Sequence, residues 1–472
     1  MQLTVISAIA LALLMVEEPF AGFLRGADWL TVLTAVCYPA VTAVLGRLSC
    51  RAGVRAGRGG GWEWQKTARR HHRLAAVNQV WMVGGLGLLI ASGLGSFVVE
   101  GLELGKIPLG AQTALIAPFV VVLIISYIVE YPFYIHTRRN IALAQIQAGL
   151  APKSSWPLGQ YIGYNLRHQF LFIALPVGLI LLAADILRLY VGPNLPEQKA
   201  EYIVPAGSLL AAVGVFLIVP ELIVRIWRTS RLADQRLRER LMSVCRTMRI
   251  RCRDILIWRS GGQIVNALVM GLVGRFRYVL LSDGLLDQLD EWQIQAVFAH
   301  EAAHVAHHHI FYSVLFAISA AGTAGLAGTW IAQSAGLPEM AGQVISAGLL
   351  VAAWIWIFGF VSRRFERQSD VSAACAISGN KEAGAQTISP QGAAVFAMAL
   401  QRIALSNGIP LERKSWRHGS VASRARYLLW LGSGRSTGRH IDNVVRWIKI
   451  LLWISLGVTA VGGAAIHRVN LI

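Results

Sequence analysis

The sequence predicts a mainly α-helical polytopic membrane protein with about nine transmembrane helices and a further domain that contains a small β-sheet. Of its 472 residues, 55% are apolar or aromatic and only 15% are charged, a balance that is typical of membrane proteins. Apolar runs long enough, or nearly so, to cross the roughly 30 Å hydrocarbon core recur along the chain. Between them lies a charged stretch that carries strand and helix signals, which predicts the additional domain.

Nine apolar runs are candidate spans, at residues 3–16, 29–46, 74–95, 112–130, 169–190, 203–224, 311–333, 342–361 and 447–465. The first run also fits the apolar core of a signal peptide, but no basic segment precedes it and no clean cleavage site follows, so we expect an uncleaved span. The spans divide the chain into an N-terminal membrane region of about six spans (1–224), a first part outside the membrane (225–310), a two-span hairpin (311–361), a second part outside the membrane (362–446) and a last span with its tail (447–472).

Positive charge is unevenly distributed between the predicted loops. If successive spans alternate in direction, segments 47–73, 131–168, 225–310 and 362–446 share one side of the membrane, and they contain 38 of the 44 Lys and Arg residues. Such a bias places these segments in the cytoplasm by the positive-inside rule. The formal net charge of +19 is therefore explained by topology, and we expect no nucleic-acid partner.

Residues 225–310 are expected to contain both helices and strands. Arg-rich residues 225–259 carry apolar side chains at three- and four-residue steps, which predicts an amphipathic helix that either lies on the membrane surface or packs within the domain. Residues 261–271 and 277–284 are short apolar runs bounded by turn signals and predict two strands. Asp290 and Gln293 are spaced as a capping box and predict the start of the next helix.

An HExxH sequence, His300-Glu301-Ala302-Ala303-His304, lies on that helix. At 3.6 residues per turn, the two imidazoles share one face and can reach a single tetrahedral Zn²⁺, while Glu301 lies beside the open coordination position. The alternative is a pair of surface histidines near the lipid headgroups, because three more histidines follow at 307–309.

A third protein ligand is expected from elsewhere in the chain, because catalytic zinc normally has three. Segment 362–370 follows the eighth span and returns to the side of the HExxH helix. It contains Glu366, with Asp370 one helical turn later on the same face. A carboxylate ligand together with a second carboxylate that orients a ligating histidine fits the requirements of such a site.

Three ordered motifs together resemble the HtpX and CAAX-prenyl-endopeptidase type of gluzincin. They are VFAHEAAHVAHHH (297–309), SRRFERQSD (362–370), which is similar to that family's S-R-x-x-E-x-x-A-D, and HGSVASR (418–424), which is similar to its H-P-S-x-x-x-R. The resemblance covers roughly residues 255–430 and leaves the six N-terminal spans unmatched. It implies a gluzincin-like zinc protease domain with one Zn²⁺ per chain.

The resemblance also implies roles for individual residues. Glu366 would be the third zinc ligand beside His300 and His304, and Asp370 would hydrogen-bond to a zinc histidine. His418 and Arg424 would stabilise the tetrahedral intermediate or support the region of Glu366.

Two further features of the resemblance concern the substrate strand and the motif mismatches. Asn266 and Ala267 would belong to an edge strand that pairs with an extended peptide substrate, because main-chain hydrogen bonds can align a peptide without requiring a fixed sequence. This chain departs from the family pattern at Ser369, where the family has Ala, and at Gly419, where the family has Pro. The second departure directly follows His418 and weakens the match on which the role of His418 rests.

The expected activity is that of a zinc-dependent membrane metalloendopeptidase in which Glu301 activates the attacking water. Its substrates would be membrane or misfolded proteins at the cytosolic membrane surface, or prenylated peptides as in one branch of the family. We expect a multi-pass protein of the bacterial inner membrane, with the lipid bilayer as a further partner. The alternatives are a non-catalytic zinc-binding sensor or scaffold, an intramembrane metalloprotease and a transporter. The charged HExxH helix and the scarcity of ionisable residues in the first six spans oppose the last two.

Overall fold

A computed structural model describes residues 2–17, 28–56, 61–147, 149, 152, 155–378, 388–434 and 439–469. The chain forms two compact units, Met1–Arg228 and Thr229–Ile472. The final residues of the predicted C-terminal tail, 470–472, lie outside the described residues.

The first unit is entirely helical over its described residues. Its α-helices are α1 (Gln2–Glu17), α2 (Asp28–Ala56), α3 (Gly61–Leu89), α4 (Gly110–Gln147), α5 (Leu158–Asn165), α6 (Phe172–Ile186) and α7 (Glu197–Ile226). Four π-helical segments extend them, η2 (Ile90–Leu94), η3 (Phe97–Gly101), η5 (Leu166–Leu171) and η6 (Leu187–Val191), and two 3₁₀ turns, η4 (Leu104–Lys106) and η7 (Gly192–Asn194), lie between helices.

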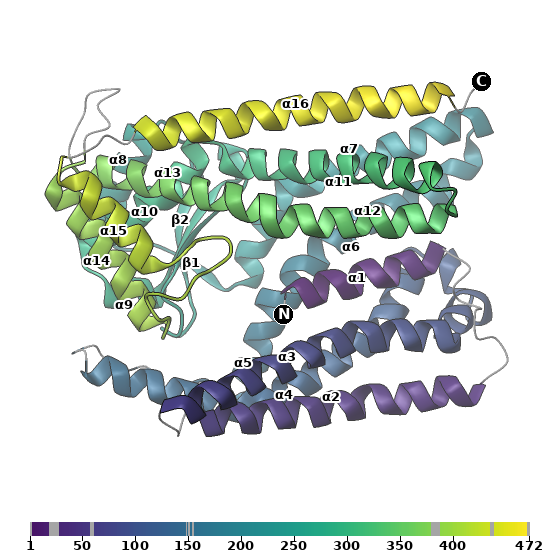
Figure 1. The fold of residues 1–472 in the computed structure, drawn as a ribbon, viewed down its shortest axis with the longest axis horizontal. Helices are drawn as coiled ribbons and strands as arrows, with labels where there is room; N and C mark the ends of the chain where they lie inside the picture. Colours follow the sequence, from purple (N-terminus) through teal and green to yellow (C-terminus); the bar gives the residue numbers. More distant parts are fainter. Residues whose placement is uncertain are drawn as a thin grey trace. The chain divides into compact units, whose positions relative to one another are not determined.

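The second unit combines a small mixed sheet with helices. Its strands are β1 (Thr229–Arg231), β2 (Asp254–Trp258), β3 (Ala267–Met270) and β4 (Tyr278–Ser282), in the order β1-β2-β4-β3. Its helices are α8 (Gln235–Thr247), α9 (Asp283–Gln288), α10 (Glu291–Ala306), α11 (His309–Ser334), α12 (Glu339–Ala353), α13 (Gly359–Ile377), α14 (Pro390–Ser406), α15 (Val421–Gly432) and α16 (Arg439–Val469), with a 3₁₀ turn η8 (Gly274–Phe276) and a π-helical segment η9 (Trp354–Phe358). In Figure 1, α11, α12 and α16 extend away from the end where the sheet and the shorter helices gather.

Eight helical segments among the described residues are long and apolar enough to cross a membrane. They coincide with eight of the nine predicted spans to within two residues at the ends where a predicted span is the longer. The predicted polytopic helical fold with its small sheet is confirmed. The ninth predicted span, residues 3–16, lies within the 16-residue helix α1, which is not among these eight segments.

The region 225–259 is more varied than the single amphipathic helix predicted. Only α8 is helical there, and β1 and β2 flank it. Leu237, Leu241 and Val244 are buried in the core of the unit. The apolar face of α8 therefore packs against the domain. The strand β2 pairs in parallel with β4, a non-local pairing that leaves no hairpin signal in the sequence.

Candidate metal centre

The HExxH helix is positioned by a capped start and a buried apolar face. Asp290 accepts a hydrogen bond from the backbone N–H of Gln293, and the Gln293 side chain completes the predicted capping box. Phe298 and Ala302 are fully buried, so packing fixes the rotation of α10. That rotation directs His300 and His304 toward α13, which packs against α10.

Three candidate ligands from two helices meet at one point. The Nε2 atoms of His300 and His304 are 3.2 Å apart, and the Glu366 carboxylate lies 3.5 Å from the first and 3.6 Å from the second. Ligands at roughly 2.1 Å around a tetrahedral zinc ion stand roughly 3.3–3.4 Å from one another. The donor set therefore fits a tetrahedral divalent ion with one open position.

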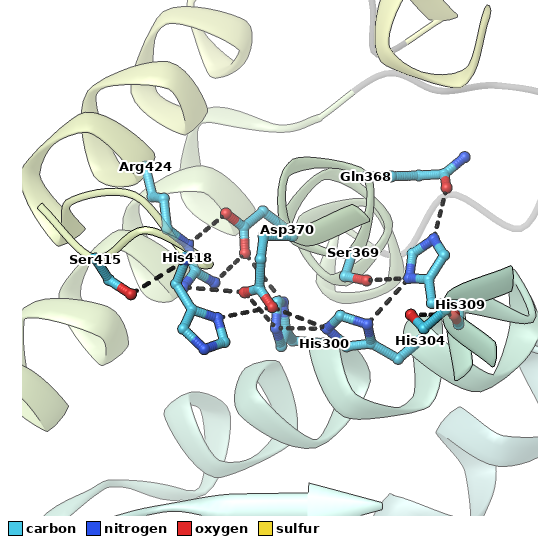
Figure 2. A network of polar contacts seen from close by, with 11 residues as sticks. His300, His304, His309, Gln368, Ser369, Asp370, Ser415, His418 and Arg424 are labelled. Atoms are coloured by element: carbon cyan, nitrogen blue, oxygen red, sulfur yellow. Dashed lines mark hydrogen bonds and ion pairs between the residues drawn. The ribbon is translucent and has the colours of Figure 1, made fainter. Parts of the chain in front are cut away.

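Asp370 and Arg424 contact the candidate ligands His300 and Glu366. The Nδ1 atom of His300 lies 3.0 Å from an Asp370 oxygen, a contact that leaves Nε2 as the donor atom facing Glu366. Arg424 from α15 contacts both Asp370 oxygens, at 2.6 and 2.8 Å, and approaches Glu366 at 3.3 Å. Figure 2 shows these side chains converging from three helices.

His418 reaches Glu366 from a tight turn before α15. Its Nδ1 atom lies 2.8 Å from the Glu366 carboxylate, and reciprocal backbone hydrogen bonds join Ser415 and Gly419 across the turn. Gly419 has φ of 75°, which a proline ring cannot adopt. Glycine in place of the family's proline is thus required by this backbone, and the departure does not displace His418. Of the two roles implied for His418 and Arg424, their contacts favour support of Glu366.

Glu301 and strand β3 line the same cavity as the candidate ligands. This cavity has a volume of about 460 Å³ and includes Asn266, Ala267, Val269, Glu301 and His418 in its lining. Because Ser282 donates its N–H to the Asn266 carbonyl, the alternation of an antiparallel ladder turns the backbone groups of Ala267 and Val269 toward the open edge of the sheet. The structure thus brings together every site residue that the sequence predicted.

Burial and charge set the protonation states of the groups on α10. Burial raises the pKa of Glu301 to about 7, with a further contribution from the Glu366 charge, so its carboxyl can exchange a proton near neutral pH. Burial and the neighbouring His300 lower the pKa of His304 to about 3, which keeps this imidazole neutral. For His300, burial acts in the opposite direction, but hydrogen bonds to Asp370 and Glu366 outweigh it and raise its pKa to about 9.

The raised pKa of His300 predicts pH-dependent metal affinity. Below about pH 9 the metal-free protein holds a proton on His300 that an incoming zinc ion must displace, so affinity should rise from about pH 6 to about pH 9 with release of one proton per ion. Competition with a chelator of known pH dependence measures how the zinc affinity changes with pH. Affinity that stays constant or falls over the same interval would contradict it.

Three residues of the site were not singled out from the sequence. His309 lies 3.0 Å from Nδ1 of His304 through its own Nδ1, and its Nε2 lies 2.9 Å from the Gln368 side-chain oxygen. The Gln368 amide nitrogen donates to Asp442 at 2.6 Å. Since Asp442 accepts, Gln368 presents its oxygen to His309, so His309 donates from Nε2 and accepts from His304. This series of hydrogen bonds leaves Nε2 of His304 unprotonated, and that atom lies 3.6 Å from the Glu366 carboxylate.

We expect His309→Leu to weaken zinc binding by roughly 10- to 100-fold, the usual effect of removing a hydrogen-bond partner of a ligating histidine. His309 is buried, whereas its neighbour His308 is exposed, so His308→Leu is the matched control. Zinc retention during chelator titration measures the difference. Equal retention in the two variants would show that the His309 contact does not orient His304.

Part of the chain is similar to a known peptidase family. Residues 232–404 match the model of peptidase family M48. The crystal structure of S. mikatae Ste24p is similar with 13% sequence identity and a TM-score of 0.45, over 87% of this chain and 99% of that one. A search of curated proteins finds no match. The family match agrees with the resemblance drawn from the motifs at 297–309 and 362–370, and we conclude that residues 232–404 form a metallopeptidase domain of family M48 in a chain with eight helices that could span a membrane.

Proposed function

We propose that the chain is a zinc-dependent endopeptidase that hydrolyses peptide bonds of membrane or misfolded proteins at the cytosolic surface of the bacterial inner membrane. The observation that carries this proposal is the tetrahedral spacing of His300, His304 and Glu366 in a cavity that also contains Glu301. A bound zinc ion would supply the Lewis acidity that peptide hydrolysis requires.

The protein's own residues account for the remaining steps. Glu301 accepts a proton from the attacking water and delivers it to the leaving amine, which its pKa of about 7 permits. The open edge of β3 binds the peptide backbone as an added strand, using backbone groups of the segment that includes Asn266 and Ala267. Asp370 orients His300, and Arg424 with His418 holds the Glu366 carboxylate in place.

The cytosolic orientation rests on charge. The loops that carry most of the Lys and Arg residues include both segments of the site, and such loops remain in the cytoplasm. The second candidate function, a non-catalytic zinc-binding sensor or scaffold, shares the metal site but does not require Glu301.

The test of the site is a metal assay paired with peptide hydrolysis for Glu366→Ala. Because Glu366 supplies the only carboxylate of the candidate ligand set, we expect the purified variant to lose both zinc and activity. Glu412→Ala, which alters an exposed carboxylate paired only with exposed Arg426 at 3.8 Å, serves as control. Full zinc occupancy in Glu366→Ala would remove Glu366 from the ligand set. Zinc binding by the wild type without any hydrolysis would favour the sensor.

A further inference from the structure

Two cavities in the second unit adjoin each other along α13. The first, called here the apolar cavity, has a volume of about 590 Å³ between α11, α12 and α16 and is lined by residues such as Phe316, Ala324, Leu349, Trp356, Phe360 and Leu452. The second, called the cationic pocket, has a volume of about 440 Å³ and is lined by Arg363, Arg364, Arg367, Lys414, Trp416 and His418, among others.

Much of the positive charge that lines the cationic pocket has no acidic partner among the described residues. No carboxylate is found among the described residues that line it. Arg363, Arg364 and Arg367 are half-buried, and none of them forms an ion pair with a carboxylate in the described part of the chain. Like charges within one helical turn repel one another, and partial burial strengthens that repulsion. An anion in the pocket would relieve it.

The two cavities share one face of the helix. Phe360 lines the apolar cavity, and Arg364 lies one turn later with its guanidinium 4.3 Å from the Phe360 ring centre. Arg367 follows on the same face, about 10 Å along the axis from Phe360. The apolar surface therefore passes directly into the cationic surface where the hydrophobic stretch of this span ends, and lipid phosphates are expected near the ends of such stretches.

We propose that the two cavities form one binding site for an anionic phospholipid, with its phosphate in the cationic pocket and an acyl chain in the apolar cavity. Arginine side chains bind phosphate oxygens in pairs, and an apolar cavity between helices suits a hydrocarbon chain. A polar anion would use only the cationic pocket, and an uncharged lipid would use only the apolar cavity.

The lipid site would also act on the proposed peptidase centre, a step that rests on the proposed function. His418 and Arg424 line both the cationic pocket and the cavity of the metal site. Arg363 donates a hydrogen bond of 2.6 Å to the Trp416 carbonyl, in the turn that carries His418. A phosphate held by the arginines would fix this turn, and with it the contact of His418 to Glu366. Anionic lipid should therefore raise kcat.

Binding is measured first, on the Glu301→Gln protein, so that the result does not depend on hydrolysis. The full chain is placed in nanodiscs of phosphatidylcholine and phosphatidylglycerol in equal amounts, then extracted and analysed by native mass spectrometry. We expect retained phosphatidylglycerol, and loss of this preference in Arg364→Gln/Arg367→Gln. The control Arg236→Gln/Arg246→Gln removes the same charge from exposed positions on α8. A preference that survives in the first variant, or falls equally in both, would overturn the proposal.

The source of the phosphate is tested with soluble glycerophosphate and with Ala352→Phe, which fills the apolar cavity. We expect Ala352→Phe to lose the lipid while keeping its zinc. Glycerophosphate should not displace the lipid from the unmodified cavities. Retained lipid in Ala352→Phe, or displacement by glycerophosphate at comparable concentration, would show a site for free anions and contradict the acyl-chain assignment.

Activity is then compared in the two kinds of nanodisc, with a soluble peptide as substrate. The wild type should show a several-fold higher kcat with phosphatidylglycerol than with phosphatidylcholine alone, and Arg364→Gln/Arg367→Gln should lose this increase while keeping its basal activity and zinc. Lipid retention without any effect on kcat would contradict the proposed effect of the lipid on the peptidase centre, while the lipid site itself would stand. Absence of hydrolysis in every sample, with lipid retained, would instead contradict the proposed function.

Discussion

Glu301→Gln should lower kcat/KM for peptide hydrolysis by on the order of 10²- to 10⁴-fold, the range expected when a general base is removed, while the zinc content stays at the wild-type level. The amide has nearly the same shape as the carboxylate but cannot accept the proton of the attacking water. Glu301 is not one of the three candidate ligands, so the metal should remain. Metal analysis and hydrolysis of a peptide by the same preparation measure both quantities.

The control for this substitution lies on the same helix. Glu291 at the start of α10 is half-buried and pairs with Arg240 at 2.9 Å. Because it does not line the cavity, Glu291→Gln makes the same chemical change elsewhere and should leave kcat/KM nearly unchanged. Hydrolysis by metal-loaded Glu301→Gln at the wild-type rate would exclude Glu301 as the base.

Arg424→Met is expected to lower the free energy of unfolding of the second unit by about 3–5 kcal/mol, the effect of removing one partner from a buried ion pair. The Arg424 side chain is 11% exposed and contacts Asp370 and Glu366, so methionine would leave two buried carboxylates without their shared cation. Zinc binding should weaken as well, because Asp370 and Glu366 would lose their orientation. Thermal unfolding of the purified protein in detergent, with metal analysis, measures both effects.

Arg426 provides the comparison, since it lies two residues later on α15 and is 73% exposed. Arg426→Met should change stability by no more than about 0.5 kcal/mol, as is usual for surface substitutions. If the two variants unfolded at the same temperature, the Arg424 network would not be a stabilising feature of the site.

Most of the fold could be predicted because hydrophobic length is a strong local signal. Eight apolar runs coincide with helices long enough to span a membrane. The region before the HExxH helix was predicted less well, because the Arg-rich segment 225–259, with apolar residues at three- and four-residue steps, predicted a single amphipathic helix that includes Asp254–Trp258. That segment is a strand because it pairs with Tyr278–Ser282, and such pairing between distant segments depends on tertiary structure rather than on the local sequence.

Some residues of the candidate site could also be predicted from the sequence, and others could not. His300, Glu301 and His304 follow from helical spacing alone, and Glu366 with Asp370 follows from the need for a third ligand and a carboxylate behind a histidine. His309 was regarded as part of a His-rich surface, although its position five residues after His304 was a usable signal. Its partners Gln368 and Asp442 come from two other helices, so only the packing of α11, α13 and α16 reveals the connection.

The account depends on a single ion held between a helix that precedes one membrane span and a helix that follows the next. An anomalous-diffraction map at the zinc edge, from crystals of zinc-loaded protein, locates that ion directly. We expect one peak at roughly 2.0–2.2 Å from Nε2 of His300, Nε2 of His304 and an oxygen of Glu366. A peak bound elsewhere, or bound by the histidines with Glu366 out of reach, would contradict the assignment of the metal centre.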